Sequence, residues 1–251
     1  MPAIEAVDLK KTFLLPHEYR TTVKEYFLHP LHRVEVERNQ VLGGVTFTIE
    51  NGEFFSVIGA NGSGKSTLLK ILAGIYRADS GELSVDGVMS PFIELGVGFN
   101  PELTGRDNIR INSTLLGLSK RELEASFDEI VAFSELERYI DQKLKNFSSG
   151  MQVRLAYAIA IQVQFQILLL DEVLAVGDQA FQEKCMETFE RLRGEGKTIV
   201  FVSHDLQAVQ QFSDRVLHLK DGLVHSLGDP AEVVGRYIAE LHAGQNVGLT
   251  R

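Results

Sequence analysis

A glycine-rich octapeptide is the feature of this sequence that most constrains its fold. Residues 59–66 read Gly-Ala-Asn-Gly-Ser-Gly-Lys-Ser, after the apolar run 54–58 and before the apolar-periodic run 67–72. This pattern predicts a strand, a phosphate-binding loop and a helix, because glycines let backbone N–H groups close around phosphate oxygens at a positive helix end. The expected phosphate-binding residues are Gly59, Asn61, Gly62, Ser63, Gly64, Lys65, Ser66 and Thr67. A glycine turn that binds nothing is the alternative, and the strand–loop–helix context disfavours it.

Two further apolar strands end in residues suited to phosphate chemistry. Residues 167–170 lead into Asp171-Glu172, and residues 199–202 lead into His204. Because parallel strands end at one edge of a sheet, we expect these side chains near the glycine-rich loop. Asp171 can hold Mg²⁺ with Ser66, and Glu172 can orient or deprotonate an attacking water. His204 can contact the γ-phosphate, although a lone histidine there is also explained as structural. Together with Lys65, Glu172 and His204 are the predicted catalytic residues.

The rest of the chain predicts a mixed α/β protein. Strands are expected at residues 4–9, 41–49, 82–85 and 198–202, and helices at 179–193 and from Asp229-Pro230 onward. Alternation of strands and helices after Gln166 indicates parallel strands with crossover helices. Helix starts are expected at Ser119 with Glu122, and again at Ser134 with Glu137, because both pairs have capping-box spacing. The final residues, 243–251, are expected to form a loose tail.

Composition excludes several classes of function. The longest aliphatic run, residues 167–170, is far shorter than the roughly 20 apolar residues of a membrane-spanning helix, and the N-terminus has no secretory pattern. We therefore expect a cytosolic protein. A formal net charge of −9 over 251 residues argues against nucleic acid as a partner. The single cysteine, Cys185, is interpreted as structural.

One loop indicates a family. Residues 146–151, Asn-Phe-Ser-Ser-Gly-Met, resemble the signature loop of ATP-binding-cassette (ABC) ATPases, and the order of motifs matches that family across almost the whole chain. The resemblance implies one nucleotide-binding domain over residues 1–242. Its fold is an α/β P-loop NTPase (RecA-like) core with an antiparallel β subdomain and an inserted helical subdomain at about 93–165. It also implies ATP and Mg²⁺ as cofactors, and a homodimer in which Ser148, Ser149 and Gly150 contact the γ-phosphate held by the other subunit. Their alternative role is a helix cap, which is compatible with the first.

Other positions are assigned only through this resemblance. Asp178 ends the segment that resembles the family's D-loop, and Glu94 stands where a glutamine that contacts the metal is expected. Phe13 occupies the place of an aromatic residue that stacks on adenine, and core packing explains it equally well.

The departures from the general family pattern resemble ATPases that export O-antigen, teichoic acid or galactan on lipid carriers. They include Met151, Glu94 and an insertion at about 14–39. Within it, Tyr19–Leu28 is interpreted either as an amphipathic gate helix at the membrane or as a surface excursion. The implied partners are an integral membrane permease pair and, through it, a lipid-linked glycan, with the chain peripheral on the cytoplasmic face of the inner membrane. After the Asp229 helix we expect no C-terminal glycan-reading domain, and the pair His29 and His32 lacks ligands for a metal site.

Three alternatives compete with this interpretation. A drug or lipid exporter ATPase would share the same motifs. A soluble ABC ATPase of translation or DNA repair is disfavoured because it would have two cassettes or a basic surface. A P-loop kinase would leave the signature loop unexplained.

Overall fold

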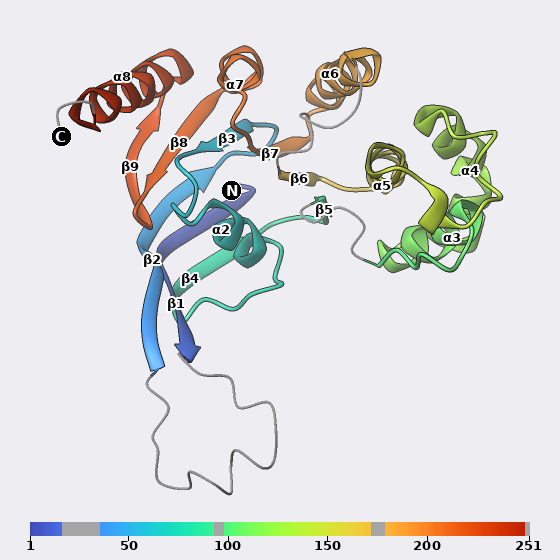
Figure 1. The fold of residues 1–251 in the computed structure, drawn as a ribbon, viewed down its shortest axis with the longest axis horizontal. Helices are drawn as coiled ribbons and strands as arrows, with labels where there is room; N and C mark the ends of the chain where they lie inside the picture. The colour runs from blue at the N-terminus through green and yellow to red at the C-terminus, as the bar shows by residue number, and fades with distance from the viewer. Residues whose placement is uncertain (17–35, 93–97, 172–178, 249–251) are drawn as a thin grey trace, which may run out of the picture.

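Two β-sheets and a separate group of helices make up the computed structural model, which describes residues 1–16, 36–92, 98–171 and 179–248 (Figure 1). One sheet has three strands in the order β2-β1-β4, and the other has six in the order β5-β6-β7-β3-β8-β9. The predicted segment Tyr19–Leu28 and the histidines His29 and His32 lie outside the described residues.

The six-stranded sheet carries the loops that the sequence singled out. Its first five strands are parallel and the last, β9, runs antiparallel to β8. This confirms the parallel arrangement expected from the strand and helix alternation. The strands are β3 (Phe54–Ile58), β5 (Met89–Phe92), β6 (Ile167–Asp171), β7 (Thr198–Val202), β8 (Arg215–Lys220) and β9 (Leu223–Gly228).

Both faces of this sheet are covered, which explains why its strands read as unbroken apolar runs. Phe54, Leu168 and Phe201 face a core shared with the helices on one side. Phe55, Leu169 and Val200 face a second core shared with the three-stranded sheet and helix α2. Alternate residues of each strand thus enter different cores, and the sheet is the central layer of the molecule.

The three-stranded antiparallel sheet is longer than predicted. It consists of β1 (Ile4–Pro16), β2 (Val36–Ile49) and β4 (Ser80–Val85). Leu14 pairs with Arg38 and Pro16 with Val36, so both ends of the expected insertion at 14–39 are strand. The prediction of a strand ending at Leu9 was therefore wrong. Register shifts interrupt the pairing, as between Leu9 and Lys10, and break the alternation from which the strand's length could be read.

Helices cover the faces of the six-stranded sheet and extend beyond its β5 edge. They are α2 (Lys65–Leu72), α3 (Gly105–Leu115), α4 (Lys120–Ser134), α5 (Ser149–Gln162), α6 (Gln179–Gly194), α7 (Leu206–Phe212) and α8 (Pro230–Gly248). In Figure 1, α3, α4 and α5 form a group to one side of the sheets. They enclose a core of their own that includes Ile109, Ile130 and Leu155.

Several predicted helix ends are confirmed, and two predictions were wrong. Ser119 and Glu122 form a reciprocal capping box at the start of α4. Ser134, by contrast, is the last residue of α4, and its hydroxyl donates to the carbonyl of Val131, so no helix begins there. α8 continues to Gly248, so residues 243–248, expected to be a loose tail, are helical.

Cys185 lies inside the core on the helix-covered face of the sheet. Burial raises the pKa of its thiol to about 12, so the thiol stays protonated at neutral pH. This environment agrees with a structural role.

Candidate functional site

The loop between β3 and α2, residues 59–64, has the geometry of an anion-binding turn, and we call it the phosphate loop. Gly64 is the N-cap of α2 with φ +105°, a left-handed conformation that favours glycine. The first turn of α2 contains no acidic residue. The positive end of the helix dipole is therefore not neutralised by its own side chains, which suits a phosphate group.

Close contacts with two neighbouring strands, β8 and β2, restrict the conformation of the loop. A Cβ on Gly59 would lie 2.2 Å from the carbonyl oxygen of Leu219 in β8. A Cβ on Gly64 would lie 2.9 Å from the carbonyl oxygen of Val41 in β2. No larger residue fits at Gly59 without moving backbone, so the path of the loop depends on two strands distant in sequence. The sequence alone gave no signal of these two contacts.

The turn between β8 and β9 also holds the loop. The amide of Gly222 donates to the carbonyl of Ser63 (3.1 Å), and its carbonyl accepts from the amide of Gly43 (2.9 Å). A Cβ on Gly222 would lie 2.3 Å from the carbonyl oxygen of Val41. One glycine thus joins the phosphate loop, β2 and the C-terminal hairpin.

Lys65 is 5% exposed, and its ammonium group is held by the loop. Its Nζ donates to the carbonyl oxygens of Gly59 (2.8 Å) and Ala60 (3.0 Å). A buried ammonium needs such acceptors. The charge is therefore placed inside the curve of the loop, where the phosphates are expected.

Two serines of the loop differ in environment. The Ser63 hydroxyl is buried and has no hydrogen-bond partner among the residues that the structure describes, although buried hydroxyls are normally bonded. Ser66, in the first turn of α2, is exposed and accessible to a ligand. The open glycine cradle and the unsatisfied Ser63 hydroxyl fit a bound nucleotide, and the exposed Ser66 hydroxyl fits a hard cation such as Mg²⁺.

The predicted catalytic strand ends lie at the same edge as the phosphate loop. β6, β7 and β3 are successive parallel neighbours in the sheet, and Asp171 pairs with Val202 at their ends. Asp171 is half-buried, and His204, two residues after the end of β7, is exposed. The structure thus brings Asp171 and His204 to the strand edge that carries Lys65, as the sequence predicted.

A cap fixes the turn that carries His204. The carboxylate of Asp205 accepts from the amides of Gln207 (2.9 Å) and Ala208 (3.1 Å) at the start of α7. The amide of Asp205 donates to the buried hydroxyl of Ser203 (3.0 Å). Ser203 and Asp205 therefore position His204, and neither was among the predicted site residues.

The predicted signature loop forms the N-terminus of α5. Ser148 is the N-cap, and its hydroxyl accepts from the amide of Met151 (3.2 Å). Ser148 and Ser149 are exposed, and a Cβ on Gly150 would meet the Ser148 hydroxyl at 3.9 Å. The N-terminus of α5 is thus exposed, and its first turn contains no acidic residue. The helix-cap role expected for Ser148 is present.

Phe13 is half-buried near the end of β1. Its ring meets Tyr76 edge-on, with the centroids 5.6 Å apart, and the Lys11 ammonium lies 5.5 Å from the ring centre. These contacts hold the ring in place but leave part of it exposed.

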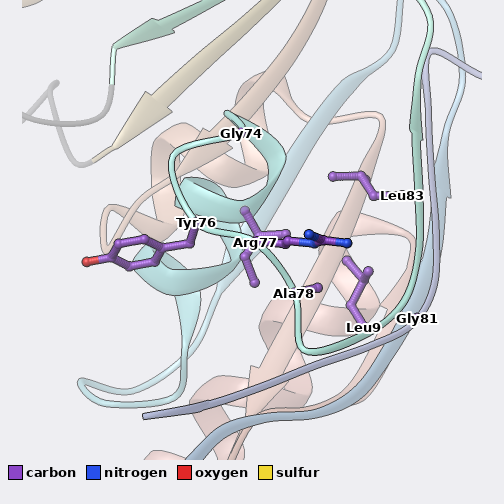
Figure 2. Close-up of a pocket in the computed structure, with 8 residues that line it drawn as sticks. Leu9, Gly74, Tyr76, Arg77, Ala78, Gly81 and Leu83 are labelled. Atoms are coloured by element: carbon purple, nitrogen blue, oxygen red, sulfur yellow. The ribbon is translucent and has the colours of Figure 1, made fainter. Parts of the chain in front are cut away.

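A separate cavity of about 450 Å³ lies between the end of α2 and strands β1 and β4. Figure 2 shows the side chain of Arg77 extending between Leu9 and Leu83, while Tyr76 points away. None of the phosphate-loop residues lines this cavity, so it is distinct from the predicted nucleotide site.

Three predicted site residues, Glu94, Glu172 and Asp178, lie outside the described residues. Their roles remain predictions from the sequence.

The chain is similar to several known proteins. A family model described as ABC transporter matches residues 42–175. An O-antigen export system ATP-binding protein of Myxococcus xanthus is 42% identical over 94% of this chain, which spans 56% of that protein. A protein of the same description from Klebsiella pneumoniae is 37% identical, and the alignment covers 94% of this chain and 97% of the relative. Among solved structures, a dimeric ATP-binding cassette in a post-hydrolysis state with ADP and Pi superposes with a TM-score of 0.74 at 25% identity, covering 90% of this chain and 98% of the other.

Proposed function

Because this chain belongs to the ABC transporter family, we propose that it is the ATP-hydrolysing subunit of an exporter that moves a lipid-linked polysaccharide across the cytoplasmic membrane. The chain is an ABC-type ATPase. The polysaccharide-export proposal rests on the sequence identity of this chain, 42% and 37% over 94% of its length, to relatives described as O-antigen export ATP-binding proteins. The glycan is of the O-antigen, teichoic acid or galactan type.

In the proposed nucleotide site, the amides of the glycine loop and the Lys65 ammonium bind the ATP phosphates. Phe13 stacks on the adenine, a role compatible with its partly exposed ring. Ser66 and Asp171 would hold Mg²⁺, assisted by Glu94. That ion, when bound, neutralises phosphate charge.

Hydrolysis in this proposal depends on two side chains at the strand ends. Glu172 orients or deprotonates the attacking water, and His204 contacts the γ-phosphate from its capped turn. The half-buried position of Asp171, one residue earlier, supports this assignment because β6 ends at the same sheet edge as β3, the strand that leads into the phosphate loop.

We further propose a homodimer in which each nucleotide contacts both chains. The exposed N-terminus of α5 would bind the γ-phosphate held by the partner subunit, with Ser149, Gly150 and the D-loop residue Asp178 at the interface. A helix N-terminus attracts phosphate through its free amides. ATP then favours the closed dimer, and loss of the γ-phosphate reopens it. The dimeric state of the solved cassette supports this arrangement.

The proposed membrane partner is a pair of permease subunits. Among the described residues, no helix is long and apolar enough to cross a bilayer. The permease would therefore provide the path for the glycan, with this chain bound to its cytoplasmic face. Residues 94–108 and the Tyr19–Leu28 segment are the proposed contacts that transmit dimer closure.

A complementation experiment tests this function. In a deletion strain of the source organism, wild-type protein should restore surface polysaccharide. Glu172→Gln should instead leave the lipid-linked glycan on the cytoplasmic side of the membrane. Glu187→Gln, an exposed change on α6, is the matched control and should restore export. Normal surface glycan in the deletion strain, together with impaired efflux of a drug or lipid, would instead identify another class of exporter.

A further inference from the structure

A cavity of about 250 Å³ lies between the phosphate loop and the C-terminal helix. Asn61, Gly62 and Ser63 line one side, and Lys220, Tyr237 and Glu240 line another. His218 also lines it, and His225 lies next to it through its contact with Glu240. The proposed ATP chemistry does not use His218, His225 or Glu240.

His218 is the most unusual group in this cavity. The residue lies on β8 and is 2% exposed, and within the described part of the chain its Nδ1 atom has no hydrogen-bond partner. Its ring lies edge-on to Tyr237 and to His225, with centroid separations of 4.8 and 5.0 Å. A buried nitrogen of this kind is normally bonded, so its environment calls for a ligand.

A β-bulge brings His225 to the same place. His218 pairs with Ser226 and Leu219 pairs with Val224, which leaves His225 as the extra residue of β9. Bulges re-aim side chains in this way. The Nε2 atom of His225 lies 2.7 Å from Oε1 of Glu240 on α8. Two strands and a helix therefore converge on one point.

We propose that His218, His225 and Glu240 bind a divalent transition metal ion, with Zn²⁺ as the best match. One ligand atom from each residue lies within 4.8 Å of the other two. Two imidazoles and one carboxylate form a donor set that Zn²⁺ prefers, with a water molecule in the fourth position. The hard cations Mg²⁺ and Ca²⁺ prefer oxygen ligands and fit this set poorly.

The geometry requires only small movements for binding. Tetrahedral zinc with bonds of about 2.0–2.1 Å brings its ligand atoms to about 3.3 Å apart. His225 and Glu240 are 43% and 35% exposed at their side chains and are able to change rotamer, whereas the buried His218 is the fixed ligand. Oε2 of Glu240 is 2.8 Å from the Lys220 ammonium, a contact that would orient the carboxylate from outside the metal site.

Cobalt spectroscopy tests the site directly. Tag-free, chelator-treated full-length protein is titrated with Co²⁺ without nucleotide, and Zn²⁺ is then added as competitor. Wild-type protein should bind one equivalent with the visible absorption of a four-coordinate site, and Zn²⁺ should displace it and raise the melting temperature. His225→Ala and Glu240→Gln should each weaken binding at least tenfold, since each removes one of three protein ligands.

Matched controls separate this site from other histidines of the chain. His242→Ala, an exposed change on the same helix, and the double change His29→Ala with His32→Ala should both leave Co²⁺ affinity unchanged. Thermal melts without metal establish that the His225 and Glu240 variants are folded. Wild-type affinity in folded His225→Ala and Glu240→Gln would overturn the proposal. Loss of binding in the double variant, or an absorption band of a cobalt-thiolate bond, would do so as well.

Discussion

The Nζ atom of Lys65 lies 2.8 Å from the carbonyl oxygen of Gly59, so the ammonium group caps the same loop that is expected to enclose the phosphates. The loop carbonyls hold this charge in place before ATP arrives. Binding therefore does not require the lysine to be desolvated anew, because it is already buried.

Lys65→Ala should lower ATP affinity about 10- to 100-fold, the loss expected for one charge-assisted hydrogen bond. Titration with a fluorescent ATP analogue measures the change. Lys120→Ala, which removes an exposed ammonium on α4, should bind as wild type. Equal affinity of the Lys65 and Lys120 variants would contradict the assigned phosphate contact.

Glu172→Gln should reduce steady-state hydrolysis by about 10²- to 10⁴-fold, because the amide cannot accept the water proton. ATP binding should persist, and the variant should accumulate as an ATP-dependent dimer in size-exclusion chromatography. A variant that still turns over at the wild-type rate would refute the role of Glu172.

Gly150→Ala separates folding from assembly. Among the described residues the added methyl group meets only the Ser148 hydroxyl, at 3.9 Å, so the free energy of unfolding should be unchanged or slightly raised. Hydrolysis should nevertheless fall, because the methyl group would stand between the α5 amides and the γ-phosphate held by the partner subunit.

The control for this prediction is Gly235→Ala on α8, where the added methyl group meets no atom of the described residues within 4 Å. It should raise stability by about 0.5–1 kcal/mol and leave hydrolysis intact. Full activity in Gly150→Ala would contradict the proposed contact across the dimer.

Glu53→Gln should destabilise the fold by about 2 kcal/mol, a value reduced from that of a fully buried pair because the Arg215 side chain is one-third exposed. Glu53 accepts from both Nε (2.6 Å) and Nη2 (3.0 Å) of Arg215 and raises the pKa of that guanidinium. Urea-induced unfolding without nucleotide measures the loss. Glu82→Gln, on the exposed face of β4, should unfold at the wild-type midpoint.

Sequence patterns predicted elements whose environment is uniform along their length. Phe54–Ile58 and Thr198–Val202 were expected with the observed bounds because every residue in them is buried. β1 was cut short because its register shifts break the alternation of side chains. Ser134 was misread because Glu137 follows it at capping-box spacing, although the residues between them leave the helix.

The candidate site was predictable only in part. Local spacing identified Lys65 and Asp171, because loop and strand are contiguous in sequence. The signature residues needed a family resemblance, since Ser-Ser-Gly alone indicates a cap. The convergence of His218, His225 and Glu240 depends on the β-bulge in β9 and on the packing of α8 against the sheet. Neither can be predicted from the spacing of residues in the sequence.

Two parts of the chain hold the phosphate loop. One is β3, which leads into it, and the other is Gly222, some 160 residues later, which hydrogen-bonds to it. A peptide tag or fusion partner inserted between β8 and β9 would therefore disturb the glycine-rich loop, although a linear map places the insertion near the C-terminal end. Engineering of this protein should avoid that hairpin.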